Sequence, residues 1–183
     1  MKPYILGIGG STSAASTSRR ALDHALAGAL EAGADVEVLD LATLELPLFR
    51  PDVAPSEAVQ RLVTAARRAD GLVFSSPLYH GSVSAQFKNA IDWLELLHAD
   101  PEPYLHNRVV GLIVTAGGSQ AFPAIEAMQA MVRALRGWTA PRVVPVNHAS
   151  RALAVDAPDA RTVEALRSLG AEVASAATRL RRG

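Results

Sequence analysis

The chain contains no cysteine, and this absence removes several kinds of chemistry at once. Without a thiol there is no disulfide, no thiolate nucleophile and no metal cluster held by cysteine. Long apolar runs are also missing, since none approaches the roughly 18 residues that suggest a membrane helix. The apolar stretch that starts at Tyr4 is cut at Gly7, too early for the core of a signal peptide. We therefore expect a soluble protein of the cytoplasm, without a membrane partner.

An excess of charge of one sign is missing too. Lys+Arg and Asp+Glu are both 18 among 183 residues. This balance gives no general attraction to nucleic acid, so we expect no nucleic-acid partner. Hydrophobic residues make up 49% and charged residues 20%, an ordinary globular composition. We predict a single domain over residues 1–183, because no linker or repeat divides the chain.

Strand-like and helix-like segments alternate along the chain. Short apolar runs predict strands at residues 4–8, 35–41, 72–74, 109–114 and 143–146. Apolar residues at helical spacing separate these runs, which predicts an α/β protein with a parallel sheet covered on both faces. The second run alternates in polarity and the last contains Pro145, which lacks a backbone donor, so both suit a sheet edge. This pattern predicts the doubly wound, five-stranded order 2-1-3-4-5 of the flavodoxin-like fold.

A loop rich in hydroxyls follows the first predicted strand. We predict that Ser11, Ser16, Thr17, Ser18 and Arg19 bind a phosphate, because a helix N-terminus and nearby hydroxyls donate to an anion. A bound phosphate would also relieve the cost of a cation in the first helical turn. The dinucleotide fingerprint and the nucleoside-triphosphatase loop both fail here, for want of a third glycine and of a lysine. A monophosphate therefore fits better, although an ordinary serine-capped helix explains the same residues.

The third predicted strand leads into a second loop. We expect the strand to break at 75–77 and the loop to hold a planar ligand, with candidate residues Pro77, Leu78, Tyr79, His80 and Gly81. The tyrosine offers a flat face and the glycine allows close backbone approach. The histidine is a candidate neighbour of the ligand, and as a catalyst it competes with an ordinary surface histidine beside a turn.

A third small-residue loop follows the fourth predicted strand. Its candidate binding residues are Thr115, Ala116, Gly117, Gly118 and Ser119, whose backbone amides can reach a planar ligand. With flavodoxin-like topology, a monophosphate site and a ring site together suggest FMN. The five histidines are scattered without metal-ligand spacing, so no metal site is predicted. No Gly-x-Ser-x-Gly elbow of an α/β-hydrolase is present.

At these motifs the sequence resembles the NADPH-dependent FMN reductase family. Residues 9–19 are similar to its phosphate loop, residues 76–93 to its flavin loop and following helix, and residues 115–119 to its third flavin contact. Ser13 and Ser18 stand where many members have Arg and Asn. Leu78 and His80 stand where others have Glu and Asn, and are more similar to the sulfonate-utilisation branch.

The resemblance implies an NAD(P)H-dependent enzyme that binds FMN. Hydride passes from the nicotinamide of NADPH or NADH to the flavin, and then to an acceptor such as free flavin or a quinone. The cofactor carries this reaction, so we name binding residues and no catalytic residue. Two other classes stay open: a flavodoxin-like electron carrier without nicotinamide turnover, and a regulatory flavin-binding protein. The balanced charge counts against the carrier.

The resemblance also implies a homodimer or homotetramer. A partner surface could be formed by large apolar residues on the third helix and beyond: Trp93, Leu94, Leu97, Phe122 and Trp138. The same residues could equally belong to the core.

Overall fold

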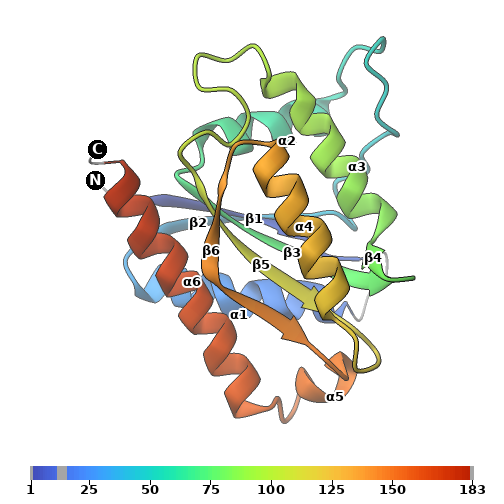
Figure 1. Ribbon diagram of the computed structural model, residues 1–183, viewed down its shortest axis with the longest axis vertical. Helices are drawn as coiled ribbons and strands as arrows, with labels where there is room; N and C mark the ends of the chain where they lie inside the picture. Colours follow the sequence, from blue (N-terminus) through green and yellow to red (C-terminus); the bar gives the residue numbers. More distant parts are fainter. Residues whose placement is uncertain (1, 12–15, 182–183) are drawn as a thin grey trace.

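The computed structural model describes residues 2–11 and 16–181 (Figure 1). Its elements are, in chain order, β1 (Tyr4–Gly9), α1 (Thr17–Glu31), β2 (Asp35–Asp40), α2 (Glu57–Arg68), β3 (Gly71–Tyr79), β4 (Ser82–Val83), α3 (Ala85–Trp93), the 3₁₀ helix η1 (Leu94–Leu97), β5 (Val109–Thr115), α4 (Phe122–Ala134), β6 (Trp138–Val146), α5 (Ala149–Ala152) and α6 (Ala160–Leu180). Residue Ser13, which we compared with the family pattern, lies outside the described residues.

The sheet has the predicted flavodoxin-like topology. Its strands lie in the order β2-β1-β3-β5-β6, and all of these pairs are parallel. The short strand β4 pairs only with β3, antiparallel, and was not predicted. Leaving β4 aside, the order equals the expected 2-1-3-4-5, with β2 and β6 at the edges. The parallel arrangement brings the carboxyl ends of β1, β3 and β5 to one edge of the sheet.

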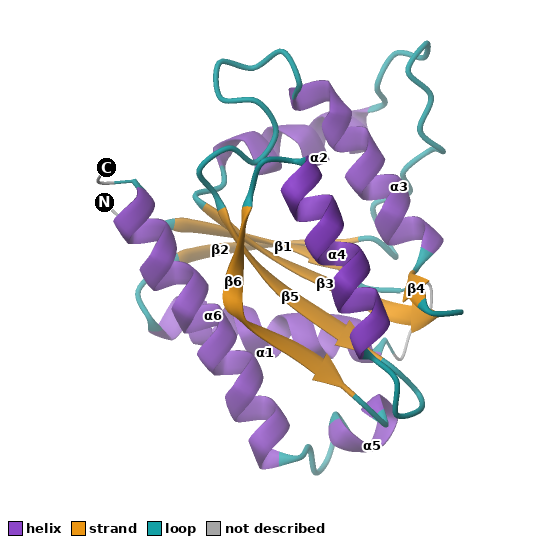
Figure 2. Cartoon of the chain, viewed as in Figure 1, coloured by secondary structure: helices purple, strands orange, loops and turns teal. Residues whose placement is uncertain are grey.

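Helices cover both faces of the sheet (Figure 2). Because successive strand residues point to opposite faces, Ile5 and Val73 join the cluster under α1 and α6, while Leu6 and Leu72 join the cluster under α2, α3 and α4. The strands are therefore apolar on both faces, as parallel strands in a covered sheet are.

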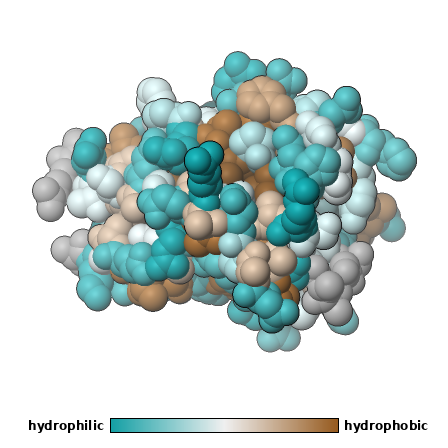
Figure 3. Space-filling view, turned by 90° about the horizontal axis from the view of Figure 1, so that it is seen from below, coloured by the Kyte–Doolittle hydropathy of each residue, from teal (hydrophilic) through white to brown (hydrophobic). Residues whose placement is uncertain are grey.

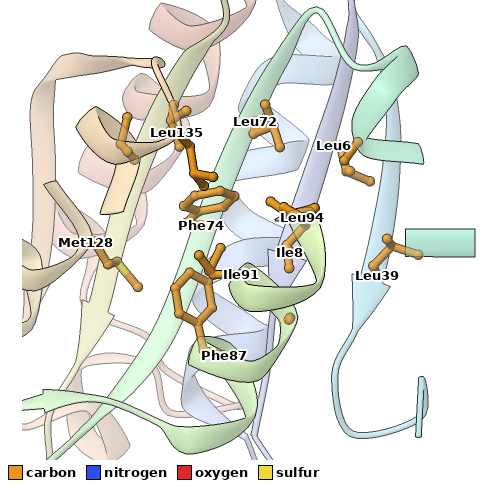
Figure 4. Packing of buried hydrophobic residues seen from close by; sticks show 14 of the residues in the cluster. Leu6, Ile8, Leu39, Leu72, Phe74, Phe87, Ile91, Leu94, Met128 and Leu135 are labelled. Atoms are coloured by element: carbon orange, nitrogen blue, oxygen red, sulfur yellow. The ribbon is translucent and has the colours of Figure 1, made fainter. Parts of the chain in front are cut away.

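The core under α2, α3 and α4 is centred on two aromatic rings (Figure 4). Phe74 of β3 and Phe87 of α3 are fully buried, and their ring centroids lie 5.4 Å apart in an edge-to-face contact. Burying side chains of this size contributes about 2–3 kcal/mol each. This contact fixes α3, and with it the hairpin before α3, against the centre of the sheet.

On the other face, α1 and α6 pack with their backbones in contact. A Cβ added to Gly170 would lie 1.7 Å from the carbonyl oxygen of Ala25, and one added to Gly28 would lie 2.0 Å from that of Arg167. Only glycine fits at these positions. The close approach holds α1 firmly, and the start of α1 is one wall of the predicted phosphate site.

The predicted break at residues 75–77 is wrong, because β3 runs on to Tyr79. Strand β1 ends at Gly9, which is paired with Ser75, so beyond this point β3 has only β5 beside it in the main sheet. Pro77 is paired with Thr115 on that side, and its missing N–H removes no bond to β1. A proline that looks like a strand breaker is thus tolerated at the tip of a central strand.

The last strand is longer than predicted and begins at Trp138. Its register against β5 shifts between Val110 and Leu112, and the residues before this shift lie outside the short apolar run that predicted the strand. Trp93, Leu94 and Leu97 are buried in the core and offer no partner surface.

Candidate functional site

The loops after β1, β3 and β5 meet at the carboxyl edge of the sheet, where open parallel sheets bind ligands. Two side-chain contacts join them. Ser75 Oγ donates to the Ser18 carbonyl oxygen at 2.8 Å, and Thr17 Oγ1 donates to Thr115 Oγ1 at 3.3 Å. These two hydrogen bonds therefore connect the start of α1 to both β3 and β5.

The first loop ends in a serine cap. Ser16 Oγ accepts a 3.1 Å hydrogen bond from the Arg19 amide and lies 3.0 Å from Ser18 Oγ. Ser11 and Ser18 are buried, whereas Ser16 and Thr17 are partly exposed. The serine-capped helix, the simpler explanation of these residues, is thus present, and the hydroxyls of Ser16, Thr17 and Ser18 lie at its N-terminus.

The cation in the first turn of α1 is already paired. Arg19 Nε lies 2.8 Å from Asp23 Oδ1, and one terminal nitrogen lies 2.7 Å from Asp40 Oδ2 at the end of β2. Burial works against the charge, but these two carboxylates outweigh it and raise the pKa of Arg19. The unfavourable placement of a cation in the first helical turn is therefore compensated by two carboxylates of the protein, and it gives no separate reason to expect a phosphate.

The second loop is a tight β-hairpin between β3 and β4. His80 and Gly81 both have positive φ, 49° and 83°, between the paired residues Tyr79 and Ser82. Two such residues in a two-residue loop are the pattern of a type I′ turn, whose twist matches the flanking strands. The turn projects Tyr79, which is 54% exposed, and His80 from the sheet edge.

Buried serines support this hairpin from below. Ser76 Oγ accepts a 2.9 Å hydrogen bond from the Ser84 amide and donates to the Pro77 carbonyl at 2.8 Å. Ser84 also caps α3 by accepting from the Phe87 amide at 3.2 Å. The half-buried Leu78 packs against the core. These hydrogen bonds and the packing of Leu78 hold the hairpin that carries the exposed ring of Tyr79.

The third loop changes from buried to exposed within a few residues. Thr115 and Ala116 are buried, whereas Gly117, Gly118 and Ser119 are exposed. A Cβ added to either glycine would meet no described atom within 4 Å. The loop at Gly117 and Gly118 therefore has room for a ligand to approach its backbone.

Sequence reasoning missed the loop that follows β6. Asn147 Oδ1 accepts a 3.0 Å hydrogen bond from the Ala121 amide before α4, and His148 Nε2 lies 3.0 Å from Ser119 Oγ. We had treated His148 only as one of several scattered histidines. Its place directly after the last strand, at the same sheet edge, was the signal that could have identified it.

The hollows on the described surface include one beside the first loop and a larger one at the opposite edge of the sheet. One of about 190 Å³ adjoins the first loop and is lined by residues that include Arg19, Asp40 and Arg61. A larger one of about 440 Å³ lies at the opposite edge, beside Asp70, Arg108 and Arg181. In this larger hollow the Arg108 guanidinium donates to the Arg67 and Ala69 carbonyls, so it serves to end α2. We therefore assign the larger hollow a structural role and place the candidate site at the carboxyl edge.

The surface at this side is mixed. Figure 3 shows the side of the molecule on which α5 lies, where apolar areas are divided by polar side chains. Within residues 2–11 and 16–181, no group of three His, Asp or Glu side chains is placed to hold a metal ion. In the same part of the chain, none of the helices has the length and apolar character needed to cross a membrane.

Comparison with known families decides what this arrangement belongs to. The family model described as NADPH-dependent FMN reductase matches residues 3–151. The chain belongs to the NADPH-dependent FMN reductase family. The resemblance noted at the three loops is thereby confirmed, and the match includes the loop with Asn147 and His148.

Individual relatives agree with this family. The chain is 33% identical over 113 residues to an NADPH azoreductase of a Bacillus species, and the match covers 61% of each protein. The chain thus spans less than two thirds of that relative's length. Among solved structures it is similar to FerB, an NAD(P)H:(acceptor) oxidoreductase of Paracoccus denitrificans, with a TM-score of 0.77, 19% identity and coverage of 97% and 98%. It is also similar to a flavodoxin of Streptococcus pneumoniae, with a TM-score of 0.63, 13% identity and coverage of 94% and 97%.

Proposed function

We propose that this protein is an NAD(P)H-dependent FMN reductase that passes reducing equivalents from nicotinamide through FMN to a small-molecule acceptor. The observation that carries the proposal is the meeting of three loops of this family's type at one sheet edge, joined by Thr17–Thr115 and Ser75–Ser18. When bound, FMN accepts hydride and hands electrons on, while the protein supplies binding and orientation.

The first loop suits the phosphate of FMN. The first turn of an α-helix has amides without partners inside the helix, and the hydroxyl residues Ser16, Thr17 and Ser18 lie in or beside the first turn of α1. The buried Ser11 follows the end of β1. A phosphate there needs no side-chain cation, because amides and hydroxyls can donate to all of its oxygens. Arg19 stands at the side of this site, where its ion pair with Asp40 holds it toward β2.

The second and third loops suit the ring system. The open space at Gly117 and Gly118 lets a flavin approach the backbone there, and Gly81 gives the same freedom at the hairpin tip. Tyr79 offers an exposed aromatic face, with His80 beside it. Pro77, Leu78, Thr115 and Ala116 are more buried and hold these exposed groups in place.

The acceptor that we favour is a planar, conjugated compound such as a quinone or an azo dye. The azoreductase relative supports this class, and so does the open aromatic surface at Tyr79.

We propose further that the protein works in the cytoplasm as a homodimer or homotetramer, with Phe122 and Trp138 at an interface. These two side chains are 51% and 61% exposed, so both are available for contact with a second copy. A monomer by light scattering at micromolar concentration would contradict the assembly.

The function is tested with the purified full chain. FMN is titrated by absorbance and fluorescence, and oxidation of NADPH and NADH is followed with FMN, a quinone or an azo dye as acceptor. We expect FMN binding and nicotinamide oxidation that depends on the acceptor. If FMN binds but neither nicotinamide is oxidised, the protein is an electron carrier or a regulatory flavoprotein, and the enzyme proposal is wrong.

A further inference from the structure

We infer that His148 is a positioning residue that holds the ring-side glycine loop ready for FMN by bonding to Ser119. The inference rests on the proposed function. Its basis is the contact of His148 Nε2 with Ser119 Oγ at 3.0 Å, between the loops after β6 and β5. His148 also donates its backbone N–H to the Gly118 carbonyl at 2.9 Å. His148 therefore bonds to the loop at residues 117–119 through both its ring and its backbone.

The backbone of His148 is held in an uncommon conformation. Its φ and ψ are 47° and 46°, in the left-handed region, which is uncommon for residues other than glycine although Asn, Asp and His are enriched there. Such a conformation persists where surrounding contacts fix it. The Ala149 amide donates to the Ala116 carbonyl and the Ala116 amide to the Val146 carbonyl, both at 2.9 Å. The left-handed turn is what carries the imidazole back over the glycine loop.

The glycine loop needs such a support. Gly117 and Gly118 lie in open space and carry the largest conformational freedom that a chain can have. A ligand that orders them must overcome that entropy, so a loop ordered in advance binds more tightly. Asn147 fixes the far end of the loop at Ala121, and His148 fixes its middle. The loop after β6 thus serves as a fourth, indirect part of the flavin site.

The chemistry of the ring accounts for the choice of residue. Imidazole is long enough to reach Ser119 from the left-handed turn, and in either charge state it can bond to a hydroxyl, as donor or as acceptor. Asparagine tolerates the left-handed turn better but is shorter. If only the backbone mattered, asparagine would serve at least as well as histidine.

The test compares FMN affinity in Ser119→Ala, His148→Asn and the double variant with that of the wild type. We expect each single variant to weaken FMN binding about fivefold through loss of one hydrogen bond, and the double variant to be no weaker. His148→Gln, which restores the reach, should recover most of the affinity. His106→Asn, an exposed histidine at the opposite edge, is the matched control and should bind FMN normally.

A second readout is independent of FMN. Hydrogen exchange of the apoprotein should speed up at residues 117–119 in Ser119→Ala and His148→Asn, with an unchanged melting temperature. FMN affinity equal to wild type in both variants, or losses that add in the double variant, would overturn the inference. A wild type that binds no FMN would instead overturn the proposed function, and the positioning of a flavin loop with it.

Discussion

The hydroxyl of Ser75 in β3 lies 2.8 Å from the carbonyl oxygen of Ser18 in α1, and both residues are fully buried. This contact connects the centre of the sheet to the first turn of the helix that faces the predicted phosphate. Because α1 is also fixed against α6 through its glycines, a small change at Ser75 acts mainly at the start of the helix.

We therefore expect Ser75→Ala to lower the free energy of unfolding by about 1 kcal/mol, the usual net value of one hydrogen bond. FMN affinity should fall as well, because the N-terminus of α1 is less well placed. Urea denaturation and FMN titration measure the two effects. Ser168→Ala, which removes an exposed bond to Glu164, is the control and should change neither quantity. Weaker FMN binding without any loss of stability would contradict this account.

The aromatic face at the hairpin gives a second prediction. Tyr79→Ala should weaken FMN binding or raise the KM for a planar acceptor about fivefold, the typical value of an aromatic contact. Tyr79→Phe keeps the ring and should behave as the wild type. Stability should not change in either variant, because the side chain is exposed. Steady-state kinetics and fluorescence titration are the measurements, and equal behaviour of the Ala and Phe variants would rule out a role for the ring.

The contact between α1 and α6 gives a prediction about stability. Gly170→Ala would push a methyl group into the carbonyl of Ala25, so we expect a loss of about 3 kcal/mol or failure to fold. Gly33→Ala is the control: its φ is 91°, but open space surrounds it, so strain alone should cost about 1 kcal/mol. Chemical denaturation compares the two. A milder effect at Gly170 than at Gly33 would show that the helices can separate freely.

The N-terminus of α6 gives a pH-dependent prediction. The hydroxyl and the amide of Thr162 both donate to Asp159 Oδ2, at 2.7 and 2.8 Å, and lower the pKa of this carboxyl below its ordinary 3.8. A lowered pKa means that the stabilisation is present above pH 3.8 and is lost as the pH falls through the folded-state value. NMR titration should show the low pKa, and Thr162→Val should raise it. Because valine keeps the backbone amide, a pKa that does not respond to Thr162→Val would disprove the Thr162 hydroxyl as a cause of the shift.

The three loops of the candidate site could be predicted from the chain, because local patterns decide which segments follow each strand. Strand, small-residue loop and helix follow one another after β1, β3 and β5, and topology alone brings their ends together. The positive φ of Gly81 likewise suits its residue type. The strand break predicted at Ser75–Pro77 is wrong, because β3 continues through these residues. Whether a proline interrupts a strand depends on whether a neighbouring strand needs its N–H, and the neighbouring strand is set by the tertiary structure.

The sequence by itself determined the order of the five parallel strands and the long helices between them, the flavodoxin-like sheet and the three candidate loops, since apolar periodicity and turn chemistry act over a few residues. Only the tertiary structure decided which partners the polar groups take. It paired Arg19 with Asp40, buried Trp93 in the core, and brought His148 to Ser119 from 29 residues away. These contacts depend on how separate elements pack against one sheet, and no spacing along the chain encodes them directly.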